Sequence, residues 1–254
     1  MATSQLIQIS KEWIGKVALV TGASAGIGLQ LLKSLTNSGI RCVGCARNIS
    51  KIEELSNGVI AHRCDVSNDT EVKFMFEMLR EKLGGVDILI NNAGLSHYSP
   101  LLTGSTEEWR EMLQVNILGL SICTREFLQQ LKSRLVETGY VVNLCSMSGH
   151  RVLTDPNYHF YAATKYAVTA LTEGLRQELR ATGSGVKVSQ ISPGLVDTEF
   201  KGRAMKDMTA AKVYYESNPV LTCEDISQSV LYLLSTPQHV SVHDILMRPT
   251  RELK

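Results

Sequence analysis

Long hydrophobic runs are missing from this sequence. No stretch of the 254 residues approaches the ~18 uninterrupted apolar residues that a membrane-spanning helix needs. Residues 1–16, MATSQLIQISKEWIGK, have neither a basic start nor a continuous apolar segment, so we expect no cleaved signal peptide. We therefore expect a cytoplasmic protein without a membrane span.

An excess of charge of one sign is also missing. The chain has 26 Lys and Arg against 25 Asp and Glu, a formal net charge of +1. Nucleic acids and anionic membranes attract strongly basic surfaces, and this balance gives no reason to expect either as a partner. A small molecule is the partner that the composition favours.

Paired cysteines with metal-binding spacing are missing too. Cys42 and Cys45 form a CxxC, but they lie in RCVGCA, a run short enough to be a strand. Side chains three positions apart on a strand point to opposite faces, and the second CxxC of a zinc site is absent. We expect no metal site, and six buried free thiols in a reducing compartment.

Short apolar segments alternate with helical patterns along the whole chain. The strand-like segments are 16–22, 41–46, 59–66, 86–94, 140–146, 186–194 and 242–247. The helical patterns cover 25–39, 69–85 (with Asp69 as N-cap), 106 to about 138, 160–183 and 223–235. Residues 195–222 are polar and read as irregular.

This alternation predicts one Rossmann-type, doubly wound α/β domain over residues 1–254. Near-continuous apolar strands are typical of a parallel sheet, here with seven strands, that has helices on both faces. Ligands of such sheets bind beyond the carboxyl ends of the strands.

The first strand ends in TGASAGIG, with glycines at 22, 26 and 28. Glycines there allow a tight turn and let backbone N–H groups approach a phosphate at the start of a helix. The spacing is not G-x-G-x-x-G, and no GK[ST] follows, which excludes a P-loop. The first strand-to-helix turn is therefore predicted to bind a nucleotide.

An acid is missing where an NAD site would place one, about 20 residues further on. Arg47 occupies that region, and a guanidinium suits the 2′-phosphate of NADP(H), although a solvated arginine is the alternative. Asp65 in CDVSN is read either as an adenine contact or as a turn former. The NNAG segment, 91–94, offers amide donors and room for a cofactor, or is a plain turn.

Tyr161 and Lys165 are four residues apart on a predicted helix and share one face. A nearby ammonium favours phenolate, so we expect Lys165 to lower the pKa of Tyr161 and make it an acid–base group. Tyr158 and Tyr166 have alanine at the corresponding positions. The preceding strand ends in NLCSMSG, which brings Ser146 and Ser148 to the same edge.

Together these segments resemble the short-chain dehydrogenases/reductases, in their single-domain branch. The matching motifs, in family order from about residue 15 to 249, are TGASAGIG, NNAG, QVNILG, Ser146, YAATK and SPGLVDT. The segments SMSGHRV and VHDILMRPT are similar to the animal subgroup of steroid reductases and farnesol dehydrogenases.

The resemblance implies an NADP(H)-dependent enzyme that interconverts an alcohol and a carbonyl. In a tetrad of Asn116, Ser146, Tyr161 and Lys165, the tyrosine exchanges the proton and the serine binds the substrate oxygen. The lysine holds the nicotinamide ribose, and the asparagine holds a water in a break of the long helix. The implied cofactor-binding residues are Gly22, Ser24, Ala25, Gly26, Ile27, Gly28, Arg47, Asn48, Asp65, Val66, Asn92, Ala93, Gly94, Tyr161, Lys165, Pro193, Gly194, Val196 and Thr198.

The substrate is less defined. Apolar residues of segment 195–222 favour an isoprenoid, retinoid or steroid under a lid, with ordinary loop packing as the alternative. Tyr158 and His159 are expected at the cavity entrance. The resemblance implies a homodimer or homotetramer. Apolar residues of the two long helices belong to the core, the subunit seam or both: Leu113, Leu120, Phe127, Leu171, Leu175 and Leu179.

Two departures from the family leave alternatives open. The family serine often stands 13 residues before the tyrosine, which fits Ser148, whereas the SM pair favours Ser146. Ala25 replaces a basic residue, so Arg47 would hold the 2′-phosphate almost alone. A non-catalytic NADP-binding regulator and a nucleotide-sugar epimerase are the alternative functions.

Overall fold

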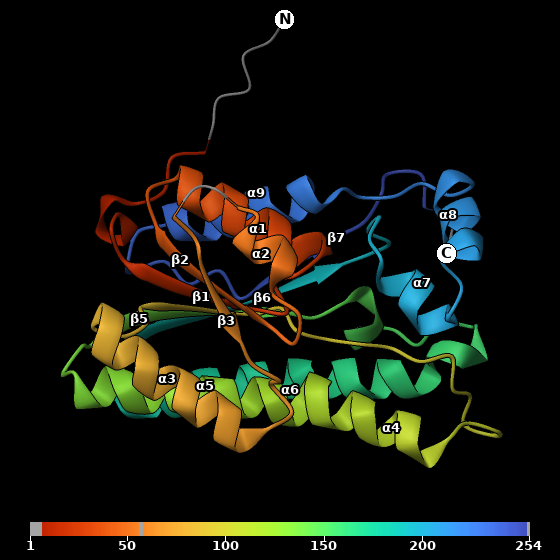
Figure 1. Ribbon diagram of the computed structural model, residues 1–254, viewed down its shortest axis with the longest axis horizontal. Helices are drawn as coiled ribbons and strands as arrows, with labels where there is room; N and C mark the ends of the chain where they lie inside the picture. The colour runs from red at the N-terminus through yellow and green to blue at the C-terminus, as the bar shows by residue number, and fades with distance from the viewer. Residues whose placement is uncertain (1–6, 56–57, 253–254) are drawn as a thin grey trace, which may run out of the picture.

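A seven-stranded sheet forms the centre of the computed structural model, which describes residues 7–55 and 58–252 (Figure 1). All neighbouring strands are parallel, in the order β3-β2-β1-β4-β5-β6-β7. The strands are β1 (Val17–Thr21), β2 (Arg41–Ala46), β3 (Ile60–Arg63), β4 (Ile88–Asn91), β5 (Thr138–Leu144), β6 (Gly185–Pro193) and β7 (Asp244–Met247). The direction of winding reverses between β1 and β4, which opens a crevice at their carboxyl ends. The predicted doubly wound sheet is confirmed.

Helices cover both faces of the sheet (Figure 1). One face carries α1 (Gly26–Asn37), α2 (Ser50–Glu53) and α9 (Cys223–Ser235), and the other carries α3 (Asp69–Leu83), α5 (Leu120–Ser133) and α6 (His159–Ala181). The central strand β1 is buried on both sides: Ala18 packs in the core beneath α1 and α9, and Leu19 in the core beneath α3 and α5. Cys42 and Cys45 likewise lie in these two separate cores, as the strand geometry predicts.

The long helix predicted from 106 to about 138 is three segments and ends earlier. It consists of α4 (Thr106–Leu113), the π-helix η2 (Gln114–Gly119) and α5, which ends at Ser133. Leu135 then takes a left-handed φ of 56°, and Thr138 is already paired with Gly185 as the first residue of β5. The cap prediction is also off by one residue, because Asn68, not Asp69, accepts backbone N–H bonds at the start of α3.

Segment 195–222 is helical, so the prediction of an irregular lid is wrong. It contains α7 (Phe200–Met205) and α8 (Met208–Glu216), and its ends meet in a bridge between Val196 and Leu221. Asp207 caps α8 by accepting from Ala210 N at 2.9 Å. Helices this short show little periodicity in sequence.

Short 3₁₀ turns complete the chain: η1 (Lys11–Trp13), η3 (Met147–Gly149) and η4 (Pro156–Tyr158). Within residues 7–55 and 58–252, every helix is too short or too polar to cross a bilayer. Residues 1–6, part of the segment in which we expect no signal peptide, lie outside the described residues.

Candidate active site

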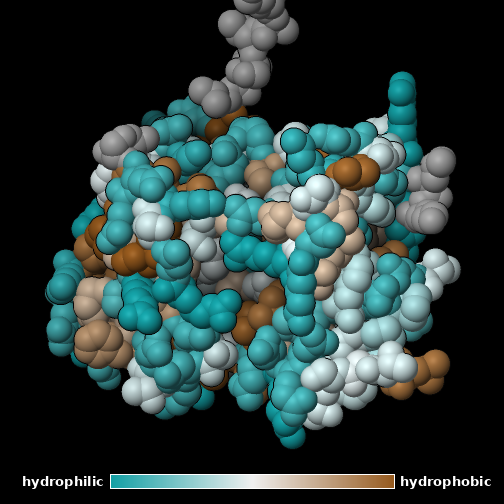
Figure 2. Space-filling view, turned by 45° about the vertical axis from the view of Figure 1, so that its right-hand side comes forward, coloured by the Kyte–Doolittle hydropathy of each residue, from teal (hydrophilic) through white to brown (hydrophobic). Residues whose placement is uncertain are grey.

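A cavity of about 1480 Å³ lies at the carboxyl ends of the strands, bounded by α7 and α8. Figure 2 shows a hollow on this side of the molecule, with hydrophilic side chains around much of its rim. Ser146, Tyr161, Lys165 and every predicted cofactor-binding residue except Gly28 line it. Gly28 and Asn116 are buried behind the wall. The structure therefore brings the predicted residues together in one place.

The glycine-rich turn is built for close backbone packing. Gly22 has a φ of 64°, and a Cβ there would lie 2.7 Å from the Cα of Ala93. A Cβ at Gly28 would lie 2.5 Å from the Asn92 side-chain amide. That amide donates to the carbonyls of Thr21 and Gly22 at 2.9 and 3.1 Å, which ties the ends of β1 and β4 together. Its donors are thus used within the protein, whereas Ala93 and Gly94 leave the room for a ligand.

Arg47 and Asp65 stand at the ends of β2 and β3. Arg47 is exposed on the cavity wall, free to meet an anionic group. Asp65 Oδ1 accepts from the backbone N–H and the hydroxyl of Ser67, at 3.0 and 2.7 Å. Asp65 is therefore a turn former that also lines the cavity, so its two interpretations are compatible.

Of the two candidate serines, Ser146 is the one whose side chain acts on Tyr161. The Ser146 side chain lies near enough to Tyr161 to lower the pKa of its phenol, and the Ser146 hydroxyl accepts from the backbone N–H of Ser148 at 3.0 Å. Both serines lie on the cavity wall, but Ser148 is buried and makes no described bond to the tyrosine. The geometry thus favours Ser146.

Lys165 lies behind Tyr161. Its Nζ donates to the carbonyl of Leu144 at 2.9 Å and lies 5.7 Å from the centroid of the Tyr161 ring. Burial raises the pKa of Tyr161 well above its usual range, and the Ser146 side chain offsets only part of this. Burial also lowers the pKa of Lys165. The net shift of the tyrosine pKa is therefore opposite to the lowering predicted from Lys165, because burial dominates it.

Asn116 lies in the π-helix η2, which confirms the predicted break in the long helix. Its side chain donates to the carbonyl of Leu95 at 2.9 Å and to the Thr164 hydroxyl at 3.0 Å, and it accepts from Leu95 N at 2.9 Å. It thereby joins the loop after β4 to α6, one residue before Lys165. Two groups that could not be identified from the sequence hold these residues in place. The Thr164 hydroxyl accepts from Asn116, and the Leu144 carbonyl accepts from Lys165.

Of the two residues predicted at the cavity entrance, only Tyr158 lines the cavity. His159 does not, because its ring nitrogen bonds to the carbonyl of Leu153 at 3.0 Å. The tyrosine hydroxyl accepts from Lys201 at 2.8 Å. Lys201 also lines the cavity, and nothing in the polar segment around it marks it in the sequence.

The lid contributes apolar side chains only in part. Those on the cavity wall are Leu195, Phe200, Met205, Tyr214 and Tyr215. Met208 and Val213 point away and are more than half exposed, at 53% and 58%.

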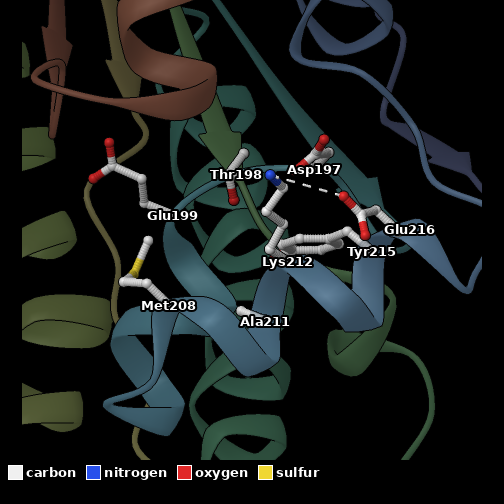
Figure 3. A pocket seen from close by; sticks show the side chains of 8 residues that line it. All are labelled: Asp197, Thr198, Glu199, Met208, Ala211, Lys212, Tyr215 and Glu216. Carbon is white, nitrogen blue, oxygen red and sulfur yellow. Dashed lines mark ion pairs between the residues drawn. The ribbon is translucent and has the colours of Figure 1, made fainter.

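A second cavity, of about 340 Å³, lies between α8 and residues 197–199 (Figure 3). Thr198, Glu199 and Tyr215 line both cavities and so form the wall between them. Figure 3 shows Lys212 and Glu216, 3.9 Å apart, directed toward each other along α8. Both are exposed, and we assign this cavity no function. Among the described residues, no group of three metal-ligating side chains occurs.

Comparisons with known proteins agree with this geometry. Residues 16–209 match the short chain dehydrogenase family. The chain is 48% identical to "Dehydrogenase/reductase SDR family member 11" of Homo sapiens, covering 96% of this chain and 97% of that protein. It is 39% identical to farnesol dehydrogenase of Aedes aegypti, covering 95% and 98%.

Solved structures are similar over nearly the whole chain. The closed form of a serine dehydrogenase complexed with NADP+ has a TM-score of 0.85 and 31% identity, covering 91% of this chain and 94% of that one. An alcohol dehydrogenase from the archaeon Thermococcus sibiricus, complexed with 5-hydroxy-NADP, has a TM-score of 0.81 and 30% identity, covering 94% and 98%.

Proposed function

The chain belongs to the short-chain dehydrogenase family, and from this premise we propose that it interconverts an alcohol and a carbonyl with NADP(H). The observation that carries the proposal is a buried tyrosine on the wall of the large cavity, with Ser146 on the same wall and the Lys165 ammonium 5.7 Å from its ring. A purely NADP-binding regulator has no need of this arrangement.

The residues of the cavity fit NADP(H). The positive-φ turn at Gly22 and Gly26 and the start of α1 suit a pyrophosphate. Arg47 at the end of β2 suits the 2′-phosphate, and no acid stands beside it in the sequence to favour the free ribose hydroxyl of NAD(H). Relatives of known structure bind NADP+ or 5-hydroxy-NADP. When bound, the nicotinamide supplies or accepts the hydride.

The proton moves at the hydroxyl oxygen of Tyr161. Because burial keeps the phenol neutral, Tyr161 donates a proton to the carbonyl oxygen of a substrate that is being reduced. Ser146 stabilises the same oxygen as negative charge develops on it. Lys165 and Asn116 are fixed by hydrogen bonds to Leu144 and Leu95 and hold this wall of the cavity.

We infer that the substrate is largely apolar, of isoprenoid, retinoid or steroid size. Leu195, Phe200 and Met205 supply apolar surface beside Tyr161, and the Tyr161 and Phe200 rings lie 5.7 Å apart. One relative of this chain is named for farnesol, an apolar alcohol.

The experiment is to record NADPH absorbance with a panel of aldehydes and ketones. Replacing Tyr161 by Phe should lower kcat by about 100-fold to 10,000-fold, because a positioned general acid contributes that much, while NADPH binding stays unchanged. Tyr166→Phe, on the exposed face of the same helix, is the matched control.

Retained turnover in Tyr161→Phe would overturn the mechanism. No turnover of any panel member by the unmodified protein, with NADPH binding intact, would instead favour the regulatory alternative.

We also propose a homodimer or homotetramer in the cytoplasm. Phe127 and Leu120 belong to the core, but Leu113 and Leu171 are each 40% exposed on the long helices and are available for a subunit seam. All six cysteines are free thiols, five of them buried, which suits a reducing compartment. Sedimentation analysis of the purified protein tests the assembly.

A further inference from the structure

Lys201 is a buried ammonium on the wall of the large cavity. Its residue is 7% exposed, and its Nζ donates to the hydroxyl of Tyr158 at 2.8 Å. Among the described residues, no carboxylate forms an ion pair with it. Burial of an ammonium away from water is costly unless an opposite charge compensates it. We therefore expect an anionic group of a ligand to pair with Lys201.

Three tyrosines, which we call the tyrosine cluster (Tyr98, Tyr158 and Tyr214), surround this ammonium. Nζ lies 3.8 Å from the ring centroid of Tyr214, 5.1 Å from that of Tyr158 and 5.7 Å from that of Tyr98. The Tyr98 and Tyr158 hydroxyls are 3.1 Å apart and bond to each other. Aromatic faces attract a cation and fix its place, but they bring no negative charge.

The ammonium stands at the substrate end of the cavity, near the proton donor. The rings of Tyr158 and Tyr161 have centroids 6.4 Å apart, and Phe200, the neighbour of Lys201 in the chain, packs 5.7 Å from the Tyr161 ring. Asp155 also lines this part of the cavity, and its charge contributes to the raised pKa of Tyr158. Asp155 Oδ1, however, accepts from Asn157 N at 3.0 Å.

We propose that Lys201 binds a carboxylate of the substrate, placed away from the carbonyl or alcohol carbon that reacts at Tyr161. The inference rests on the proposed function and narrows its substrate class to apolar molecules with an acidic end, such as oxo acids and hydroxy acids. An ammonium has three donors; Tyr158 accepts from one and the Tyr214 ring covers a further side of the ammonium, which leaves a donor for a carboxylate oxygen. A charged oxygen forms stronger bonds there than a neutral acceptor does.

The test compares three aldehydes of one chain length with the full protein and NADPH: ω-oxodecanoic acid, its methyl ester, and decanal. We expect the acid to have the lowest KM. Lys201→Met, which keeps the length and removes the charge, should raise the KM for the acid about 10-fold to 100-fold, because a bond to a charged group contributes that much. The KM for the ester and for decanal should change less than about 3-fold, because neither substrate carries a charge that Lys201 could bind.

Two controls separate charge from packing. Lys212→Met, on the exposed face of α8, should leave the KM for all three substrates unchanged. Lys201→Arg should restore most of the preference for the acid, because it restores the charge. Equal changes for acid and ester in Lys201→Met would mean a structural role and would overturn the proposal, and so would no change for either.

A second measurement does not depend on the variant folding. Decanoate should inhibit reduction of decanal by the unmodified protein at least about 10-fold more strongly than decanamide does. Equal inhibition would overturn the proposal. If none of the three aldehydes is reduced, the proposed function fails for this substrate class, and calorimetric binding of decanoate against decanamide to the NADPH-loaded protein still decides the role of Lys201.

Discussion

The two walls of the large cavity are held in different ways. On the strand side, backbone and buried amides fix the geometry: Asn92 bonds to the carbonyls at the end of β1, and Lys165 to the carbonyl at the end of β5. On the lid side, apart from the buried contacts of Lys201 and Phe200 with Tyr158 and Tyr161, side chains on the surface make the contacts. Glu199 pairs with Lys51 at 2.8 Å, and Lys206 with Glu108 at 2.9 Å.

This difference in bonding predicts different roles for the two walls in catalysis and in substrate selection. Buried hydrogen bonds are expensive to break, so the strand side presents one fixed arrangement to the cofactor and to the transferred proton. Exposed ion pairs contribute little, so the lid can adapt to the substrate. Substitutions on the strand side should therefore change chemistry, and substitutions on the lid should change which substrate is selected.

The largest effect in this comparison concerns the two serines. Ser146→Ala should lower kcat by about 100-fold or more, because it removes the donor that stabilises the reacting oxygen. Ser148→Ala is the matched control, and it should stay within about 5-fold, because its hydroxyl makes no described bond to Tyr161. Steady-state kinetics with a reducible aldehyde measure both. A larger loss in Ser148→Ala would reverse the assignment.

Arg47 gives the next largest effect. Arg47→Ala should raise the KM for NADPH about 10-fold to 100-fold through the loss of a charge-assisted bond to the 2′-phosphate. The KM for NADH should barely change, since NADH lacks that phosphate.

Arg41→Ala, at the opposite end of the same strand, is the control for the general loss of a positive charge. An equal rise for both cofactors in Arg47→Ala would contradict the preference for NADP(H).

The strand side could be predicted from the sequence because its signals are local. The glycines of TGASAGIG and the spacing of Tyr161 and Lys165 each lie within one turn or one helix, so the periods of strand and helix place them. Even the ambiguity between Ser146 and Ser148 concerned two positions. Only contact with the tyrosine, 15 residues further on, resolves it in favour of Ser146.

The lid side could not be predicted, because its contacts join distant segments. Lys201 contacts Tyr98, Tyr158 and Tyr214, which come from three separate parts of the chain. The state of Tyr161 was mispredicted for a related reason. The position of Lys165 on the helix is readable, but the burial that outweighs it depends on the whole fold.

The core beneath the strand side should make the protein sensitive to alkali. Burial raises the pKa of the Cys42 thiol to about 12, against a usual value of 9.0. As the pH rises above about 9, the unfolded chain loses this proton first, so the free energy of unfolding falls. The stability is complete below about pH 9 and decreases by up to ~1.4 kcal/mol per pH unit for each such group. Urea unfolding at a series of pH values measures the slope.

Cys42→Ala separates this group from the others. The lost packing lowers the free energy of unfolding at every pH. Above about pH 9, however, the slope of that free energy against pH should decrease by the amount that one titrating group contributes. An unchanged slope would show that Cys42 does not contribute. Tyr140, whose pKa burial raises to about 12, accounts for part of the remaining slope above about pH 10.

The smallest effect is expected at the ion pair that joins the lid to the cofactor side. Lys51 and Arg203 lower the pKa of Glu199, so the carboxylate is charged at neutral pH. The Lys51 and Glu199 side chains are 53% and 36% exposed, so water and salt screen their attraction. A double-mutant cycle of Glu199→Gln and Lys51→Met should give a coupling energy of about 0.2–1 kcal/mol in thermal unfolding, smaller at high salt.

The same cycle in kinetics tests the contrast between the walls. If exposed ion pairs affect the position of the lid only slightly, kcat in both single variants should stay within about 3-fold of the value for the unmodified protein. That view would be contradicted if Glu199→Gln and Lys51→Met each lowered kcat about tenfold and the double variant lowered it no further. The lid would then be fixed by this pair as firmly as the strand ends are fixed by Asn92, and its freedom to adapt to substrate would have to lie beyond Glu199, in α7 and α8.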